Sequence, residues 1–144
     1  MAVFLGGGTE QQSESVGRLF ESYGLAFQII DDVLNLRGFQ ENRKNRGEDI
    51  TRGKITAPVA KAMGRLGKSD RIRLWSIIDS KPADPDTIRE AIFLIDGCGA
   101  LQACSDEAHE LVESTWAEIE SQLPDSQFKV RMRSFGWFVL DRHY

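Results

Sequence analysis

The sequence predicts an all-α protein, and three observations support this fold class. Apolar residues recur every three or four positions along most of the chain, which is the period of an amphipathic helix. No segment shows the strict alternation of apolar and polar residues that indicates a strand. Glycines and prolines fall between the periodic segments, where they end one helix and allow another to begin. We therefore expect a helical bundle of about six helices around one long helix.

The long helix is expected near the N-terminal end of the sequence. Residues 2–5 form a short apolar run that three glycines interrupt, and Thr9 then offers an N-cap for a helix that begins near Glu10. One apolar face continues from there to about Leu36. Residues 38–47 are polar and have no apolar period, so we expect a loop there.

Five further helices are expected after this loop. The first begins at Pro58, which suits the first turn of a helix because it has no N–H to leave unpaired. Ser69 and Asp70 are expected to cap the second helix, and Asp84 or Asp86 the third. The apolar segments that define the five helices are 57–66, 72–78, 88–95, 101–123 and 128–140.

Composition indicates a globular protein and excludes several functions. The 144 residues are expected to form one domain over 1–144, with 41% hydrophobic and 28% charged residues. A formal net charge of −4 argues against nucleic acid as the partner, and no apolar stretch is long enough for a transmembrane segment. Cys98 and Cys104 should lie on different helix faces and stay reduced, which favours a cytoplasmic protein. With His109 they match no common zinc-binding spacing.

Late in the long helix, polar side chains share one sector of about 100° beside the apolar face, at about 100° per residue. They are Gln28, Asp31, Asp32 and Asn35. Such oxygen donors suit Mg²⁺, which takes one or two protein carboxylates and completes its shell with water and phosphates. The alternative is that both aspartates are solvated residues at the end of a helix. Their mutual repulsion, and the unfavourable position of negative charge near a helix C-terminus, favour a bound cation.

A basic segment that contains two glycines follows the long helix. Its sequence is Lys44-x-x-Gly47-x-Asp49-x-x-x-Gly53-Lys54-x-Thr56-x-Pro58. Lysines beside glycines can approach an anion without steric obstruction, and the helix that begins near Pro58 adds the positive end of its dipole. A basic loop alone is often merely solvated. Next to a carboxylate face, it predicts a site for a metal ion and a diphosphate.

Together the two motifs resemble the second aspartate-rich region of the trans-isoprenyl (polyprenyl) diphosphate synthases. The resemblance begins with Gly24-Leu-Ala-Phe27-Gln28-Ile-Ile-Asp31-Asp32-Val-Leu-Asn35 and continues, in order and correctly spaced, through the basic segment. It implies the C-terminal half of the isoprenoid synthase fold, in a bundle that is usually dimeric. It also implies a prenyltransferase of isoprenoid biosynthesis, which uses Mg²⁺ to condense an allylic diphosphate with isopentenyl diphosphate.

The resemblance also implies roles for individual residues, although it identifies no separate catalytic residue. Asp31 and Asp32 would bind Mg²⁺, with the direct bond carried by Asp31, and Asn35 would be a weaker ligand. The residues that would bind or orient the substrate diphosphate are Gln28, Lys44, Lys54 and Arg142, and Phe27 would lie at the isoprenoid pocket.

This sequence departs from the family pattern in ways that bear on activity. The pattern Asp-Asp-x-x-Asp ends here in Asn35, whose amide oxygen can contact a metal or its water but adds no charge. The first aspartate-rich motif and the basic segments that bind isopentenyl diphosphate are absent, and family members are much longer. We therefore expect this chain to be inactive alone, with exposed apolar surface that leads to a homo- or hetero-oligomer or takes the missing N-terminal half.

Two alternatives stay open. The chain could be a non-catalytic subunit that heterodimerises with a full-length synthase, and Asn35 favours this interpretation. It could instead be a fragment of a terpene cyclase, which the synthase-like spacing from Lys44 to Pro58 disfavours.

Overall fold

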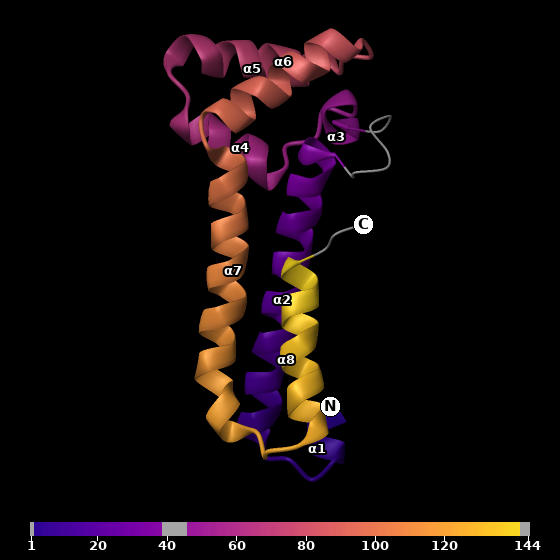
Figure 1. Ribbon diagram of the computed structural model, residues 1–144, viewed down its shortest axis with the longest axis vertical. Coiled ribbons are helices and arrows are strands. Elements are labelled where there is room, and N and C mark those ends of the chain that lie inside the picture. Colours follow the sequence, from indigo (N-terminus) through magenta and orange to yellow (C-terminus); the bar gives the residue numbers. More distant parts are fainter. Residues whose placement is uncertain (1, 39–45, 142–144) are drawn as a thin grey trace. The chain divides into compact units, whose positions relative to one another are not determined.

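The computed structural model describes residues 2–38 and 46–141, and all regular structure in these residues is helical. In chain order the elements are α1 (Ala2–Leu5), α2 (Glu10–Arg37), α3 (Glu48–Thr51), α4 (Ala57–Arg65), α5 (Lys68–Ser80), α6 (Pro85–Gly97), α7 (Ala100–Ile119), a 3₁₀ helix at Glu120–Gln122, and α8 (Gln127–Leu140) (Figure 1). The all-α prediction is confirmed. Among the described helices, none combines the length and the hydropathy needed to cross a membrane.

Two predicted N-caps are present in the structure. At the start of α2, the hydroxyl of Thr9 accepts the backbone N–H of Gln12 at 3.2 Å. At the start of α6, the carboxylate of Asp84 accepts the backbone N–H of Thr87 at 2.8 Å. Each side chain satisfies a donor that the first turn of a helix otherwise leaves unpaired.

Other boundaries differ from the prediction. Gly67, and not Ser69 or Asp70, occupies the N-cap of α5, so the predicted cap is wrong. Asp70 instead lies within the first turn, where a carboxylate is stabilised by the helix dipole. The short helix α3 and the 3₁₀ helix were not predicted, because so few residues show no apolar period. Most of the loop expected at 38–47 lies outside the described residues.

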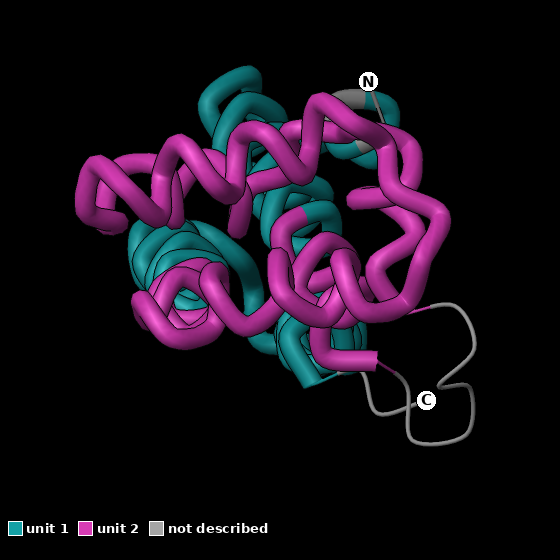
Figure 2. Tube along the Cα trace, turned by 90° about the horizontal axis from the view of Figure 1, so that it is seen from above, with its two compact units in different colours: residues 1–28, 107–142 teal, residues 29–106, 143–144 magenta. Residues whose placement is uncertain are grey.

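The chain divides into two compact units, and the division passes through α2 and α7 (Figure 2). Unit 1 contains Met1–Gln28 and Glu107–Arg142, whereas unit 2 contains Ile29–Asp106. Both long helices continue from one unit into the other. A single family domain over residues 1–144 stays a prediction.

Unit 1 joins the first part of α2, the last part of α7 and α8. Tyr23 of α2 is 1% exposed, and its hydroxyl donates to the carbonyl of Met132 in α8 at 3.1 Å. Burial raises the pKa of this hydroxyl above its ordinary value. The hydroxyls of Ser22 and Thr115 join α2 to α7 at 2.9 Å. Other buried apolar residues of the unit are Leu19, Ala26, Ala108, Val112, Trp116, Ile119, Val139 and Leu140.

One surface of unit 1 is aromatic and half-exposed. Phe20 of α2 and Phe135 and Phe138 of α8 are 49%, 46% and 50% exposed. Ring centroids lie 6.5 Å apart between Phe20 and Phe135, and 6.4 Å apart between Phe135 and Phe138. We call these three residues the aromatic face. The expectation of exposed apolar surface is confirmed for this unit.

Unit 2 has an apolar core to which the end of α2, helices α3 to α6 and the start of α7 all contribute. Its buried residues are Leu36, Ile50, Val59, Ala62, Leu66, Leu74, Ile77, Ile78, Ala91, Ile92, Ile95, Ala100 and Leu101. Between α5 and α6, the guanidinium of Arg73 makes two hydrogen bonds of 2.6 Å to the carboxylate of Glu90. This core fixes the end of α2 against α3 and α4, which carry the basic segment.

Candidate metal and diphosphate site

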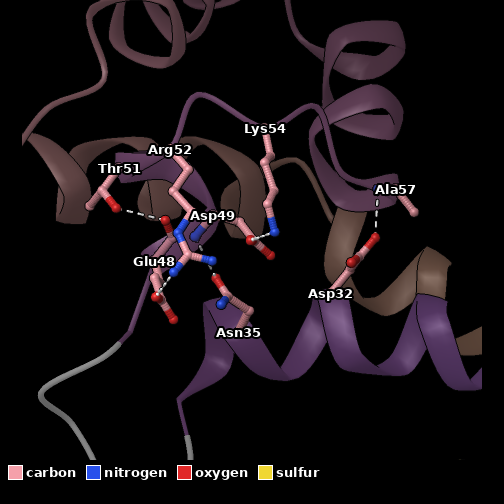
Figure 3. Close-up of polar contacts among 8 residues, drawn as sticks. All are labelled: Asp32, Asn35, Glu48, Asp49, Thr51, Arg52, Lys54 and Ala57. Atoms are coloured by element: carbon pink, nitrogen blue, oxygen red, sulfur yellow. Dashed lines mark hydrogen bonds and ion pairs between the residues drawn. The ribbon is translucent and has the colours of Figure 1, made fainter.

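The two adjacent aspartates of α2 have different surroundings. Asp31 is exposed, whereas Asp32 is partly buried. The Oδ2 atom of Asp32 accepts the backbone N–H of Ala57 at 3.1 Å (Figure 3). Because Ala57 is the first residue of α4, this hydrogen bond joins α2 to the N-terminus of α4. A carboxylate at that end of a helix is stabilised by the helix dipole.

Asn35 lies one turn further along α2 and contacts the start of α3. Its Oδ1 accepts the backbone N–H of Asp49 at 3.3 Å, and its backbone carbonyl accepts the N–H of Gly47 at 2.9 Å. Glycine is required at position 47, because φ is +80° and a Cβ there would lie 2.5 Å from Ile88. The side chain of Asn35 is therefore engaged with the backbone of α3.

Lys54 lies in the turn between α3 and α4. Its Nζ is 2.6 Å from Oδ1 of Asp49, and its backbone N–H donates to the Asp49 carbonyl at 2.9 Å. Gly53 has a positive φ of 68°, which lets the chain reverse direction between the two charged residues. The side chain of Lys54 is 53% exposed and that of Asp49 only 15%. An ammonium group has three donors, so one ion pair leaves Lys54 able to bind an anion as well.

The other predicted site residues lie outside this group. Gln28 and Phe27 precede the aspartates on α2, in unit 1, and both are exposed. Lys44 and Arg142 lie outside the described residues. Three of the predicted residues contact the segment 49–57 or lie in it. Asp32 contacts Ala57, and both Asn35 and Lys54 contact Asp49. Asp31 lies on the same helix as Asp32 and Asn35.

Two partners in this site could not be assigned from the sequence. The backbone N–H of Ala57 carries no side-chain signal, and its contact with Asp32 depends on how α4 packs. Asp49 belongs to the basic motif, but no role follows from the motif alone. Gly53 permits a tight reversal of the chain, and a carboxylate and a lysine lie on either side of it. This pattern could have predicted the ion pair between Asp49 and Lys54.

The donors of the site fit Mg²⁺ bound together with a diphosphate. Mg²⁺ takes one or two carboxylates from the protein and the rest of its oxygen shell from water and phosphates. Among the described residues, no group of three or more His, Cys, Asp and Glu side chains could hold a metal ion unaided. Two neighbouring aspartates agree with such a shell, and the exposed ammonium of Lys54 is a positive charge of the kind that binds phosphates. The buried hydroxyl of Thr56 has no partner among the described residues.

The sequence model of the polyprenyl synthetase family matches residues 1–95. The chain belongs to the polyprenyl synthetase family. The matched region includes both motifs of the site, from Gly24 to Pro58.

Curated proteins similar to this polyprenyl synthetase chain are much longer than it is. The short chain isoprenyl diphosphate synthase of Methanothermobacter thermautotrophicus is 33% identical over 141 residues, which cover 97% of this chain and 42% of that protein. The octaprenyl diphosphate synthase of Haemophilus influenzae is 30% identical over 144 residues, which cover 99% of this chain and 43% of that protein. The chain thus spans less than half the length of these curated relatives.

Solved structures of polyprenyl synthetases share the fold. A decaprenyl diphosphate synthase from Rhodobacter capsulatus matches with a TM-score of 0.85 and 26% identity, over 99% of this chain and 44% of that one. A polyprenyl synthase from Caulobacter crescentus matches with a TM-score of 0.80 and 30% identity, over 92% of this chain and 40% of that one. The latter protein is complexed with calcium and isoprenyl diphosphate.

Proposed function

We propose that this chain is the C-terminal half of a polyprenyl diphosphate synthase and carries its second aspartate-rich metal site. The whole enzyme would condense an allylic diphosphate with isopentenyl diphosphate. Family membership and the names of the relatives support the reaction class. The observation that carries the proposal is the 3.1 Å hydrogen bond from Ala57 to Asp32, because it joins the acidic end of α2 to the turn of Lys54.

The residues of the site would bind the diphosphate of the allylic substrate. Asp31 would carry the direct bond to Mg²⁺ on the acidic face, where Asp32 is its neighbour and Asn35 lies at the border. When bound, Mg²⁺ supplies positive charge that compensates the negative charge developing on the departing diphosphate. Lys54 donates to the phosphate oxygens as a compact point charge. Gln28 orients the metal-binding face from the preceding turn of α2.

The remaining predicted residues would complete the substrate contacts. Lys44 and Arg142 add positive charge for the diphosphate, and Phe27 contacts the isoprenoid chain. This chain spans less than half of its curated relatives, and no first aspartate-rich motif occurs in its sequence. We therefore propose that it is inactive alone and that turnover requires the other half of the fold.

Calorimetry with inorganic pyrophosphate tests the site directly. We expect pyrophosphate to bind the chain in the presence of Mg²⁺ and to lose at least about tenfold in affinity when EDTA removes the metal. Asp31→Ala should cause a similar loss, because it removes a carboxylate from the metal-binding face. The matched control is Asp79→Ala, which removes an exposed carboxylate from α5 and should leave binding unchanged. Binding that is independent of Mg²⁺, or insensitive to Asp31→Ala, would contradict the proposal.

A second candidate function is a non-catalytic subunit that associates with a full-length synthase. The observation that favours it is Asn35, an amide at the position where the family pattern has a third carboxylate. The two functions differ in what restores activity. Adding a separately expressed N-terminal half should produce turnover only for the first function, whereas stable association with an intact synthase supports the second.

A further inference from the structure

Two side chains of α2, one helical turn apart, contact the segment 49–57 at its two ends. Asp32 accepts the N–H of Ala57 at 3.1 Å, and Asn35 accepts the N–H of Asp49 at 3.3 Å (Figure 3). Residues three apart on a helix face the same side, so both contacts come from one face of α2. Lys54 lies between the two contacts in the chain.

The N-terminus of α4 is unusual, because the side chain that accepts a hydrogen bond from its first turn belongs to another helix, α2. Thr56 occupies the N-cap position but makes no side-chain cap hydrogen bond. Pro58 has no N–H, so Ala57 provides one of the few donors in the first turn. Asp32 supplies the acceptor that Thr56 does not, and its negative charge suits the positive end of the helix. Removing this acceptor would free the start of α4.

The contact at the other end of the segment fixes Lys54 indirectly. Asn35 holds the backbone of Asp49, and the carboxylate of Asp49 holds the ammonium of Lys54 at 2.6 Å. The amide oxygen of Asn35 makes its contact without placing a second negative charge beside Asp49. An aspartate at position 35 could accept the same hydrogen bond but would repel that carboxylate.

We propose that Asp32 and Asn35 are positioning residues and that Asp31 provides the metal-binding carboxylate of the acidic face. Asp32 and Asn35 hold the two ends of the 49–57 segment against α2 and so keep Lys54 directed at the bound diphosphate. Both therefore act through backbone hydrogen bonds, and the charge of Asp32 is dispensable. This inference rests on the proposed function for its diphosphate ligand.

The comparison of Asp32→Asn with Asp32→Ala in this chain tests the proposal. Asparagine keeps an oxygen acceptor for the Ala57 N–H, so Mg²⁺-dependent pyrophosphate affinity should stay within about threefold of wild type. Alanine removes the acceptor, and the affinity should fall by up to about tenfold, the factor that corresponds to the loss of one ordinary hydrogen bond. Asp31→Asn should lose affinity at least as strongly as Asp32→Ala, because an amide adds no charge for the metal.

Amide hydrogen exchange at Ala57 provides a readout that needs no ligand. The N–H should be protected from exchange in wild type and in Asp32→Asn, and it should exchange faster in Asp32→Ala. The matched control is Asp84→Ala, which removes a carboxylate cap from α6 in the same unit. It should expose Thr87 to exchange and leave both Ala57 protection and pyrophosphate binding unchanged.

The outcomes separate this inference from the proposed function. If wild type shows no Mg²⁺-dependent binding, the proposed function fails, and Ala57 exchange alone decides whether Asp32 anchors α4. If wild type binds but Asp32→Asn loses affinity as Asp31→Asn does, then Asp32 acts through its charge and the inference is overturned. Unchanged Ala57 protection in Asp32→Ala would overturn it as well.

Asn35→Asp tests the other end of the segment. A metal-binding role for position 35 predicts that the added carboxylate strengthens Mg²⁺-dependent pyrophosphate binding. A positioning role predicts no gain, because the new charge lies beside Asp49. An increase in affinity of more than about threefold would contradict the positioning role of Asn35.

Discussion

Gly136 shows how closely α8 approaches α2 at the level of one residue. A Cβ at this position would lie 2.7 Å from the hydroxyl oxygen of Tyr23 and 2.8 and 2.9 Å from two of its ring carbons. Tyr23 cannot easily move away, because it is buried and its hydroxyl is bonded to Met132. Only glycine leaves room for the ring here.

Gly136→Ala is therefore expected to lower the free energy of unfolding by about 1–3 kcal/mol through overpacking, although alanine is the better helix former. The matched control is Gly17→Ala on α2, where no atom lies within 4 Å of the added Cβ. That change should raise the free energy of unfolding by about 0.5–1 kcal/mol. Urea denaturation followed by circular dichroism measures both. If Gly136→Ala were as stable as wild type, the close packing of Tyr23 would be contradicted.

At the scale of elements, one carboxylate joins α5 to α6 and another caps α6, and both titrate in acid. The backbone N–H of Thr87 lowers the pKa of Asp84 below its ordinary value, and the hydrogen bond from Arg73 does the same to the pKa of Glu90. A carboxyl group whose pKa is lower in the folded state stabilises that state above its unfolded pKa. The stabilisation is lost as the pH falls through the folded pKa.

Unit 2 should therefore lose stability as the pH falls below about 4, because the unfolded chain then binds more protons at these two sites. In the double variant Asp84→Asn, Glu90→Gln, the groups keep oxygen acceptors but no longer titrate. The stability of this variant should change less between pH 5 and 3. Urea denaturation at several pH values measures the slope, with the exposed-carboxylate variant Asp79→Asn as the control. An equal slope in the double variant and wild type would show that other groups dominate acid unfolding.

At the scale of the whole molecule, the chain carries less than half of the residues of its curated relatives. The aromatic face of unit 1, formed by Phe20, Phe135 and Phe138, is half-exposed in this chain. Clustered aromatic rings at the surface favour association, because burying them removes apolar area from water.

We expect the chain to self-associate through this face. The double variant Phe20→Ser, Phe138→Ser should weaken self-association by about tenfold or more, because each serine removes an aromatic contact surface. Phe93→Ser is the control, since Phe93 of α6 is 75% exposed and lies in unit 2. Sedimentation velocity over a range of concentrations measures the effect. An equal effect of Phe93→Ser would contradict a specific role for the aromatic face.

The sequence alone determined the long helices and the family, whereas its assignment of the site residues stays a prediction. Helix periodicity is a local property, so α2 was predicted to within a residue or so of its observed range, Glu10–Arg37. The cap at Thr9 was predicted for the same reason, and Asp84 was one of two candidates for the cap of α6. The cap of α5 was assigned wrongly because Gly67 carries no side-chain signal. The acidic and basic motifs identified the family, and the comparison with the family model confirmed it.

Only the tertiary structure showed that Asp32 contacts the start of α4. Asp31 and Asp32 are adjacent and chemically identical, but one is exposed while the other is bonded to an N–H that lies 25 residues further along the chain. That contact exists because Leu36, Ile50 and Val59 share one apolar core, which brings α3 and α4 against the end of α2. A contact of this kind depends on how helices pack and not on the pattern within any one of them. The packing therefore decides which of the two carboxylates holds the start of α4.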